Sequence, residues 1–250
     1  MPAPSFVPSS FVLKTRPVPA EPDSCADLRL EENAVAVWIA SLPALGNLEP
    51  WTKHLNAEER ERASRFRFDI DRRRHLCGRG VLRVLAGKYL GTDPAGLRFR
   101  TSEAGKPEIV TTNPAGLRFN VSHSGDYVLV GLAWGRAIGV DVELVRPDIE
   151  PEKIAKRFFS AREQQDLASL PPADRVPAFF RCWTRKEAYV KATGEGLGLP
   201  LSQFDVSFLP GEPAALLGAR PDLLEVTRWW MQDIDVGPDY AAAVIVATST

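Results

Sequence analysis

Strands and helices are expected in separate blocks along this chain of 250 residues. Alternating or β-branched apolar segments predict strands at 34–40, 117–145 and 226–247, and helical spacing of apolar residues predicts helices at 58–91 and 151–192. Strands gathered in blocks, with helices between the blocks, are typical of α+β architectures. We therefore expect an α+β fold made of two halves of similar size.

The helical pattern gives way to an alternating one near Gly116, which predicts the division between the halves there. Six prolines within the first 22 residues, without a continuous apolar core or a basic lead-in, indicate a loose arm rather than a targeting segment. The expected units are the N-terminal arm at 1–24, an N-terminal half at 25–115 and a C-terminal half at 116–250. We also expect the apolar run 127–133 to pair with the alternating residues 138–145 as a hairpin.

Charge and cysteine content restrict the partners and the compartment. The 31 basic residues nearly balance the 32 acidic ones, so the chain as a whole gives no indication of nucleic-acid binding. Three cysteines without a CxxC pair fit a reducing cytoplasm. No stretch reaches the roughly 20 apolar residues of a membrane-spanning helix. The sequence therefore predicts a cytoplasmic protein, and it lacks the motifs of P-loop nucleotidases, dinucleotide-binding proteins, zinc proteases and serine hydrolases.

Two carboxylates, Asp141 and Glu143, stand two residues apart in the alternating segment. Side chains two apart in a strand point the same way and lie roughly 6.6 Å from each other, which suits a divalent cation. An Asp-x-Glu pair alone is more typical of the solvent-facing side of an antiparallel strand. Further along, Glu187 and Lys191 share a helix face, and the core side chain of Trp183 would hold that face at the edge of a pocket. A solvated ion pair is the ordinary alternative.

Phosphate-binding groups are the third local signal. His123, between two serines and ahead of Gly125, could hold a phosphate, or it could be ordinary hydrogen-bonded structure. Ten basic residues against five acidic ones between 58 and 88 suit a phosphate-rich ligand or an acidic partner, although solvated helices also carry such runs. Lys106 adds a cation on a loop.

In combination and in order, these segments resemble the Sfp-type 4′-phosphopantetheinyl transferases. The matching segments are GKP at 105–107, FNVSHSG at 119–125, IGVDVE at 138–143, RFFS at 157–160, WTRKEAYVK at 183–191 and GEGL at 194–197. The resemblance runs from about Asn56 to Leu201 and leaves out the arm. It implies a pseudo-two-fold pair of α+β halves in a single chain, with the active site between them, complete in a monomer.

The resemblance also implies a reaction. The 4′-phosphopantetheine arm of coenzyme A would move to a serine of an apo acyl carrier or peptidyl carrier protein, with release of 3′,5′-ADP. Asp141, Glu143 and Glu187 would ligate Mg²⁺, and Mn²⁺ suits the same all-oxygen ligands. Glu187 is similar to the residue that helps to deprotonate the serine. Lys191 is similar to the one that stabilises the charge of the departing nucleotide.

Coenzyme A contacts carry over residue by residue. The positions similar to the family's contacts are Arg62, His75, Lys106, Pro107, Ser122, His123, Lys186 and Lys191. The match is incomplete in the first helix, where the family often has two basic residues for the 3′-phosphate. Only Arg62 matches here, and Glu59 stands at the other position.

Two other functions remain open at this point. His123 could act as a general base for acyl transfer from an acyl-CoA, which would need no metal. Alternatively, the chain could be a module that binds a carrier protein or a nucleotide without turnover, although Asp141, Glu143 and Glu187 all being present argues against a lost activity. For the transferase, the arginines of 60–83 could supply a surface for an acidic carrier protein.

Overall fold

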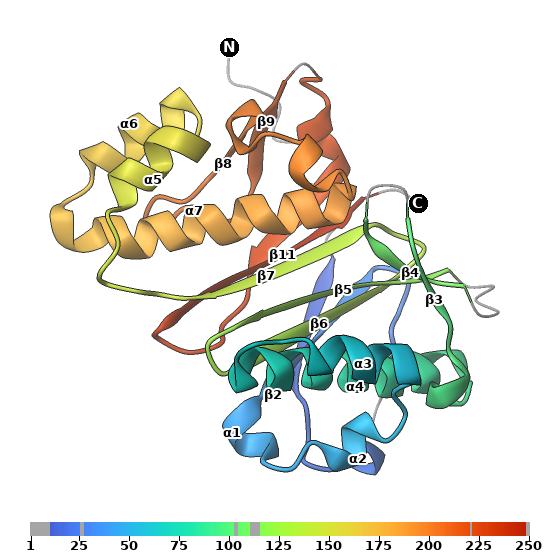
Figure 1. Cartoon of the computed structure of the whole chain (residues 1–250). Coiled ribbons are helices and arrows are strands. Elements are labelled where there is room, and N and C mark those ends of the chain that lie inside the picture. The colour runs from blue at the N-terminus through green and yellow to red at the C-terminus, as the bar shows by residue number, and fades with distance from the viewer. Residues whose placement is uncertain (1–10, 26–27, 103–104, 111–115, 221, 249–250) are drawn as a thin grey trace.

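The computed structural model describes residues 11–25, 28–102, 105–110, 116–220 and 222–248 (Figure 1). It contains two main sheets. The first has the order β1-β2-β6-β5, with β1 and β2 parallel and the other pairs antiparallel, and the second has the antiparallel order β10-β11-β7. Their strands are β1 (Val12–Pro17), β2 (Ala34–Ser41), β5 (Leu117–Ser124), β6 (Tyr127–Trp134), β7 (Ile138–Leu144), β10 (Trp229–Asp233) and β11 (Tyr240–Ala247).

Helices cover the outer face of each sheet. The N-terminal half contributes α1 (Leu42–Leu45), α2 (Glu49–Thr52), α3 (Ala57–Ser64) and α4 (Asp69–Leu90), and the C-terminal half contributes α5 (Pro151–Phe158), α6 (Ala161–Ser169) and α7 (Pro172–Thr193). Two small hairpins, β3 (Phe99–Thr101) with β4 (Pro107–Ile109) and β8 (Phe204–Val206) with β9 (Leu216–Ala219), lie beside them. Single 3-10 turns are η1 (Pro22–Ser24), η2 (Pro94–Gly96), η3 (Gly196–Gly198), η4 (Leu201–Gln203) and η5 (Glu225–Arg228). No described helix has both the length and the apolar character that crossing a bilayer requires.

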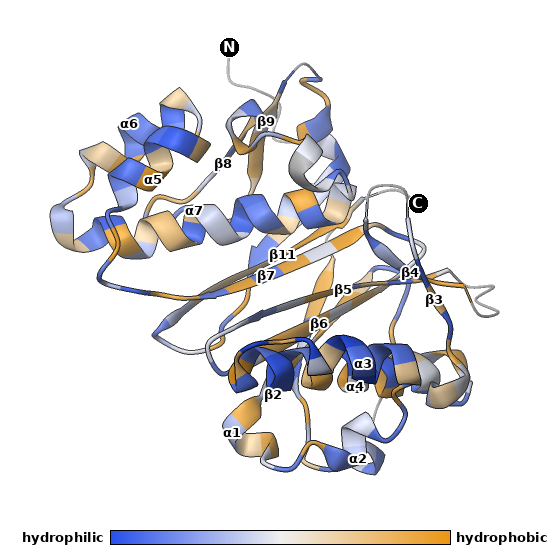
Figure 2. Ribbon diagram, viewed as in Figure 1, coloured by the Kyte–Doolittle hydropathy of each residue, from blue (hydrophilic) through white to orange (hydrophobic). Residues whose placement is uncertain are grey.

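The alternation of side chains along the strands explains this layering. In β2, Ala36 and Trp38 face the cluster around α4, whereas Val35 and Val37 face the other sheet. Val244 of β11 belongs to the same central cluster between the sheets. Both sheets therefore bury two apolar faces, and the orange strands between the partly blue helical layers in Figure 2 follow this pattern. The predicted α+β fold in two halves is confirmed.

Strand β5 joins the two sheets through its side chains. Its apolar residues face α4, and its alternate residues Asn120, Ser122 and Ser124 face β7. The Asn120 Oδ1, Ser122 Oγ and Ser124 Oγ atoms accept hydrogen bonds from the backbone N–H groups of Val140, Val142 and Leu144, at 2.9, 3.3 and 3.1 Å. Side-chain oxygens of β5, instead of a neighbouring strand's backbone, thus accept the hydrogen bonds of the N–H groups along this edge of β7.

Three predictions about the strands were wrong. The hairpin between 127–133 and 138–145 does not form, because both edges of β6 are occupied by β2 and β5 while β7 pairs with β11. Since β5 and β6 complete the N-terminal sheet, the change of sheet occurs at 135–137 rather than at Gly116. Within the predicted loose arm, Val12–Pro17 forms β1 beside β2, while residues 1–10 lie outside the described part.

Candidate active site

The site begins where α7 crosses β7 with almost no separation. Gly139 is the reason, because a Cβ atom there would overlap the carbonyl oxygen of Ala188 and lie 2.7 Å from the backbone nitrogen of Ala192. Asp141 and Glu143 follow Gly139 on the same face of β7. The close crossing therefore brings Asp141 next to Lys191 and near Glu187 of α7.

Asp141 is the centre of this arrangement. Only 3% of the residue is exposed. The Lys191 Nζ atom lies 2.6 Å from Asp141 Oδ1, and the Ser122 hydroxyl donates to the same oxygen at 2.8 Å. Lys191 Nζ also lies 2.9 Å from Ser122 Oγ. The other carboxylate oxygen, Asp141 Oδ2, is buried and has no hydrogen-bond partner among the described residues.

The charge of Asp141 affects the pKa values of two more carboxyl groups, those of Glu143 and Glu187. Burial, and then the negative charge of Asp141, raise the pKa of Glu143, although the Ser124 hydroxyl donates to Glu143 Oε2 at 2.8 Å. Burial and the same charge raise the pKa of Glu187, and the ammonium of Lys191 partly opposes this rise. Three neighbouring carboxyl groups with one orphaned oxygen form an excess of negative charge that a cation would relieve.

This group is not a closed metal cage. Within the described residues, no three Asp, Glu, His or Cys side chains converge closely enough to hold a metal ion by themselves. The three predicted ligands thus lie around one buried carboxylate, without being drawn together. One of them, Asp141, is already bonded to an ammonium group.

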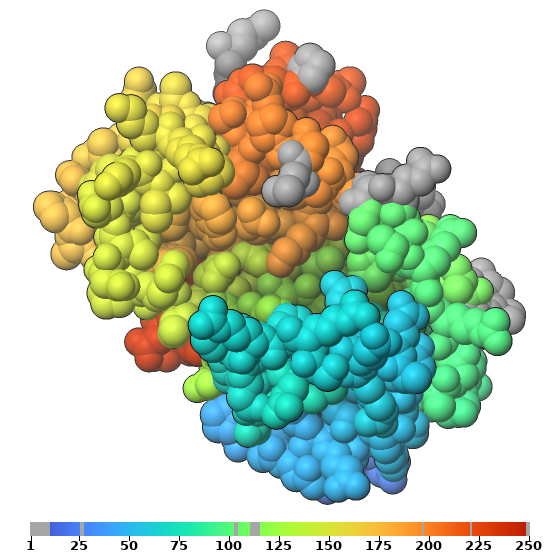
Figure 3. Space-filling model, viewed as in Figure 1, coloured from blue at the N-terminus to red at the C-terminus, as the bar shows by residue number. Residues whose placement is uncertain are grey.

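A cavity of about 550 Å³ opens beside Glu187 and Lys191, between α7 and the loop that carries Lys106 and Pro107. Its other lining residues are Gly105, Asn120, Phe158, Trp183, Val190, Gly194, Gly196, Leu199, Pro200 and Leu201. The space-filling view shows the surface hollowed between the α3–α4 layer and the α7 layer, with the strand region at its floor (Figure 3). The site therefore lies at the junction of the two halves.

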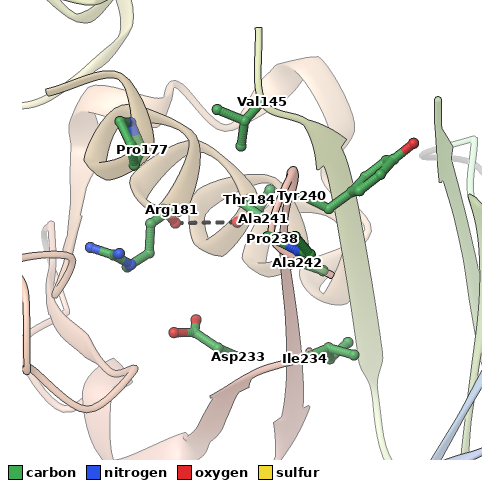
Figure 4. Close-up of a pocket in the computed structure, with 10 residues that line it drawn as sticks. All are labelled: Val145, Pro177, Arg181, Thr184, Asp233, Ile234, Pro238, Tyr240, Ala241 and Ala242. Atoms are coloured by element: carbon green, nitrogen blue, oxygen red, sulfur yellow. Dashed lines mark hydrogen bonds between the residues drawn. The ribbon is translucent and has the colours of Figure 1, made fainter. Parts of the chain in front are cut away.

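A second cavity, of about 210 Å³, contains none of the predicted site residues. In Figure 4 it lies against α7, where the Thr184 hydroxyl donates to the Arg181 carbonyl at 3.2 Å and Asp233 lies opposite. The guanidinium of Arg181 is itself bonded to the carbonyl of Phe208. The cavity lined by Glu187, Lys191 and Lys106 is therefore the candidate active site.

Comparison with known proteins decides the family. Residues 137–245 match the 4′-phosphopantetheinyl transferase superfamily, and residues 42–133 match the N-terminal part of 4′-phosphopantetheinyl transferases. The 4′-phosphopantetheinyl transferase HetI of Nostoc sp. is 38% identical over 223 residues, which cover 88% of this chain and 91% of HetI. The chain belongs to the 4′-phosphopantetheinyl transferase superfamily. The resemblance seen in the sequence is thereby confirmed, and the protein is a transferase.

Other relatives are similar over much of their length. The 4′-phosphopantetheinyl transferase Sfp of Bacillus subtilis is 33% identical over 199 residues, covering 80% of this chain and 85% of Sfp. Among solved structures, the holo-[acyl-carrier-protein] synthase of Thermotoga maritima aligns with a TM-score of 0.36 and 22% identity, over 46% of this chain and 64% of that one. The two family matches meet between 133 and 137, where the chain of this transferase changes sheets.

Lys186 corrects one prediction of a coenzyme A contact. Its ammonium is completely buried, 2.7 Å from the Leu201 carbonyl, 2.6 Å from the Phe204 carbonyl and 2.8 Å from the Glu163 carboxylate. One residue along a helix turns the side chain by about 100°, so Lys186 points into the C-terminal half while Glu187 points into the cavity. In this transferase Lys186 holds the protein interior together and has no donor left for a phosphate.

Lys106 lines the cavity and also connects three segments of the chain. Its ammonium donates to the carbonyls of Ile138 and Ala192, both at 3.0 Å, and burial lowers its pKa to about 8. The loop of Lys106 and Pro107 is thereby tied to the start of β7 and the end of α7. Both residues line the cavity.

The predicted nucleotide contacts of the N-terminal half lie near one another. Burial, followed by the charge of Arg62, lowers the pKa of His75, and His123 contributes to the same shift. The pKa of His123 is lowered by burial, then by Arg74, and also by Lys191. His75 Nε2 is buried and unpartnered among the described residues. His123 and His75 therefore form a series of side chains that leads from Lys191 of α7 to Arg62 and Arg74 of the N-terminal helices.

Two residues of this region escaped the sequence prediction. Arg74 Nε donates to the Gly125 carbonyl at 2.7 Å and so fixes the turn that follows His123. Asn120 bonds to β7 and also lines the cavity. A signal existed for Asn120, because a polar residue at 120 continues the alternation of Ser122 and Ser124. Arg74 had no signal of its own among the neighbouring arginines.

Proposed function

We propose that this transferase moves the 4′-phosphopantetheine arm of coenzyme A to a serine of an acyl or peptidyl carrier protein, with release of 3′,5′-ADP and dependence on Mg²⁺. The carrying observation is the buried Asp141, which has one carboxylate oxygen without a hydrogen-bond partner among the described residues. Its charge contributes to the raised pKa values of Glu143 and Glu187, and Glu187 lines the cavity between the halves. HetI and Sfp, both 4′-phosphopantetheinyl transferases, support the same reaction.

The residues present fit a divalent cation. Asp141, Glu143 and Glu187 would supply carboxylate oxygens, the ligands that Mg²⁺ and Mn²⁺ prefer. When bound, the metal would neutralise the pyrophosphate of coenzyme A and align it. Lys191 occupies one oxygen of Asp141 in the free protein, which leaves Oδ2 for the cation.

The remaining residues divide the other tasks. Arg62, His75 and His123 would hold the 3′-phosphate end of the nucleotide. Lys106, which lines the cavity, would make a further contact with the nucleotide. The serine oxygen forms a bond to the phosphorus next to the pantetheine arm, and the bond from this phosphorus to the bridging oxygen breaks, leaving 3′,5′-ADP. The serine proton passes to Glu187, whose raised pKa suits a proton acceptor. Lys191 stabilises the charge on the departing phosphate.

Intact-mass spectrometry of an apo carrier protein, incubated with this transferase and coenzyme A, tests the proposal. We expect a gain of about 340 Da with Mg²⁺ and none with EDTA. Carrier proteins from fatty-acid, polyketide and peptide synthesis provide the acceptors. The same acceptors with their serine changed to alanine provide the control. A gain that persists in EDTA would contradict the metal dependence, and no gain with any acceptor would contradict the reaction.

The stability of the metal-free protein should depend on pH through the carboxyl groups. Glu143 and Glu187 have raised pKa values in the folded state, so above their ordinary value of 4.5 the folded protein binds more protons than the unfolded chain. Their contribution is therefore most favourable below that value and is lost as the pH rises through the raised pKa. Mg²⁺ should restore the loss, so it should raise Tm more at pH 8 than at pH 5.

Differential scanning calorimetry with EDTA or Mg²⁺ measures this effect. The matched control is E143Q/E187Q, which keeps both side-chain shapes and removes both titrations. It should lose the part of the pH slope due to these groups and the response to Mg²⁺. A double variant with the slope and the metal response of the original chain would show that both effects come from elsewhere in the protein.

A further inference from the structure

The turn between α3 and α4 exposes three large apolar residues at alternate positions. Phe66, Phe68 and Ile70 are 38%, 58% and 39% exposed. We call these three residues the turn patch. Exposed apolar residues scattered singly are normal, whereas several large ones close together in the chain are typical of an interaction surface.

Local structure does not account for Phe68. It occupies the N-cap position of α4, and its side chain makes no capping hydrogen bond. Ser, Thr, Asp and Asn are the residues that stabilise a helix at this position. The guanidinium of the preceding residue, Arg67, lies 5.3 Å from the centre of the Phe68 ring. Neither the helix nor the core thus requires a phenylalanine here.

Positive charge surrounds the turn patch, although most nearby arginines are engaged within the protein. Arg65, Arg72 and Arg74 pair with Glu61, Asp69 and Asp71, and Arg79 and Arg83 pair with Glu59. Arg62 and Arg67 are exposed, and neither has a carboxylate partner among the described residues. Arg60 and Arg73 donate to backbone carbonyls. Of the predicted basic surface of 60–83, two exposed guanidinium groups therefore remain without a carboxylate or carbonyl partner among the described residues, beside three apolar side chains.

The turn patch is continuous with the candidate active site. The Phe66 ring lies 5.2 Å from the ring of His75, centre to centre. The charge of His123 contributes to the lowered pKa of His75, and the charge of Lys191 contributes to the lowered pKa of His123. In Figure 3 the α3–α4 layer forms one wall of the hollow between the halves. A partner on the turn patch would thus have its surface next to the site.

We propose that the turn patch is the docking surface for the carrier protein, and that it receives a surface on which apolar residues lie beside carboxylates. This inference rests on the proposed function. The apolar residues of the partner would bury Phe68 and Ile70, while one of its carboxylates would pair with Arg67. Arg62 is left to the 3′-phosphate of coenzyme A. Docking of the carrier protein beside the cavity would bring its acceptor serine to Glu187.

The test compares F68S/I70S with the original chain, using initial rates at varied carrier concentration. The KM for the carrier should rise about ten-fold or more, because a few central apolar residues dominate such interfaces. The KM for coenzyme A, and kcat at saturating carrier, should stay within about two-fold. R67E should also raise the KM for the carrier, and it should weaken the dependence of that KM on salt.

The matched control is L223S/L224S. These two leucines, 77% and 66% exposed, lie on the C-terminal half, where the nearby Arg228 is paired with Asp222 and Glu225. This variant should retain the original KM for the carrier. Equal thermal unfolding of all variants would exclude misfolding.

An unchanged KM in F68S/I70S, while the original chain transfers normally, would overturn the docking surface and leave the proposed function intact. A self-associating original chain that becomes monomeric in F68S/I70S, again without a change in KM, would assign the turn patch to a second copy of the chain instead. Absence of transfer by the original chain itself would overturn the proposed function and the docking surface with it.

Discussion

Replacing Glu187 by Gln is expected to lower kcat by about 10² to 10⁴-fold, the usual contribution of a positioned general base. Glutamine keeps the length and the planar end of the side chain, so the cavity and α7 should stay as they are. It cannot accept a proton, and it removes one of the three charges around the predicted metal. The Kd for coenzyme A should therefore change much less than kcat.

Single-turnover transfer to a carrier protein gives the rate of the chemical step, and titration calorimetry gives the affinity for coenzyme A. The matched control is E152Q. Glu152 is an exposed glutamate of α5 that pairs with Arg175, and such surface pairs contribute about 0–1 kcal/mol to stability. It should transfer at the original rate. Unchanged turnover in E187Q would remove Glu187 from both roles, base and metal ligand.

The faces of the strands and helices could be predicted from the sequence, because they depend on periods of two and of 3.6 residues. The alternation in β7 places Asp141 and Glu143 on one face, and the spacing of four places Glu187 and Lys191 on one face of α7. Each pair followed from its own segment. The two faces meet because α7 crosses β7 closely at Gly139. Before the structure, only the family resemblance indicated that the residues of the two faces act together.

The partners of the strands could not be predicted in this way. An alternating pattern predicts which residues of a strand are buried, but it does not predict which other strand pairs with it. The apolar run of β6 and the alternating β7 are adjacent in sequence, yet they belong to different sheets because β2 and β5 occupy both edges of β6. Lys186 shows the same limit. In the sequence, a lysine beside a catalytic motif looks like a contact for phosphate. Only its burial against Glu163 shows that its role is structural.

Replacing Gly139 by Ala is expected to destabilise the protein by about 3 kcal/mol or more, at the upper end of the cost of overpacking a core. The new methyl group would overlap the Ala188 carbonyl oxygen and approach the Ala192 nitrogen to 2.7 Å. Both are backbone atoms of the last two turns of α7, so no side-chain rotation can relieve the clash. The helix must move away from β7, and urea-induced unfolding would measure the loss.

The matched control is G96A, since the nearest atom to a Cβ at Gly96 is 4.0 Å away and no strained backbone angle is present there. It should unfold at nearly the original urea concentration. The clash at Gly139 should also reach the site, because the same crossing brings Asp141 against Lys191 and Glu187. Folded G139A should therefore lose the stabilisation by Mg²⁺ at pH 8 together with its stability. If G139A were as stable as the original chain, α7 could shift on β7 without cost, and the position of the site would have to be set by other contacts, such as those of Lys106 with both elements.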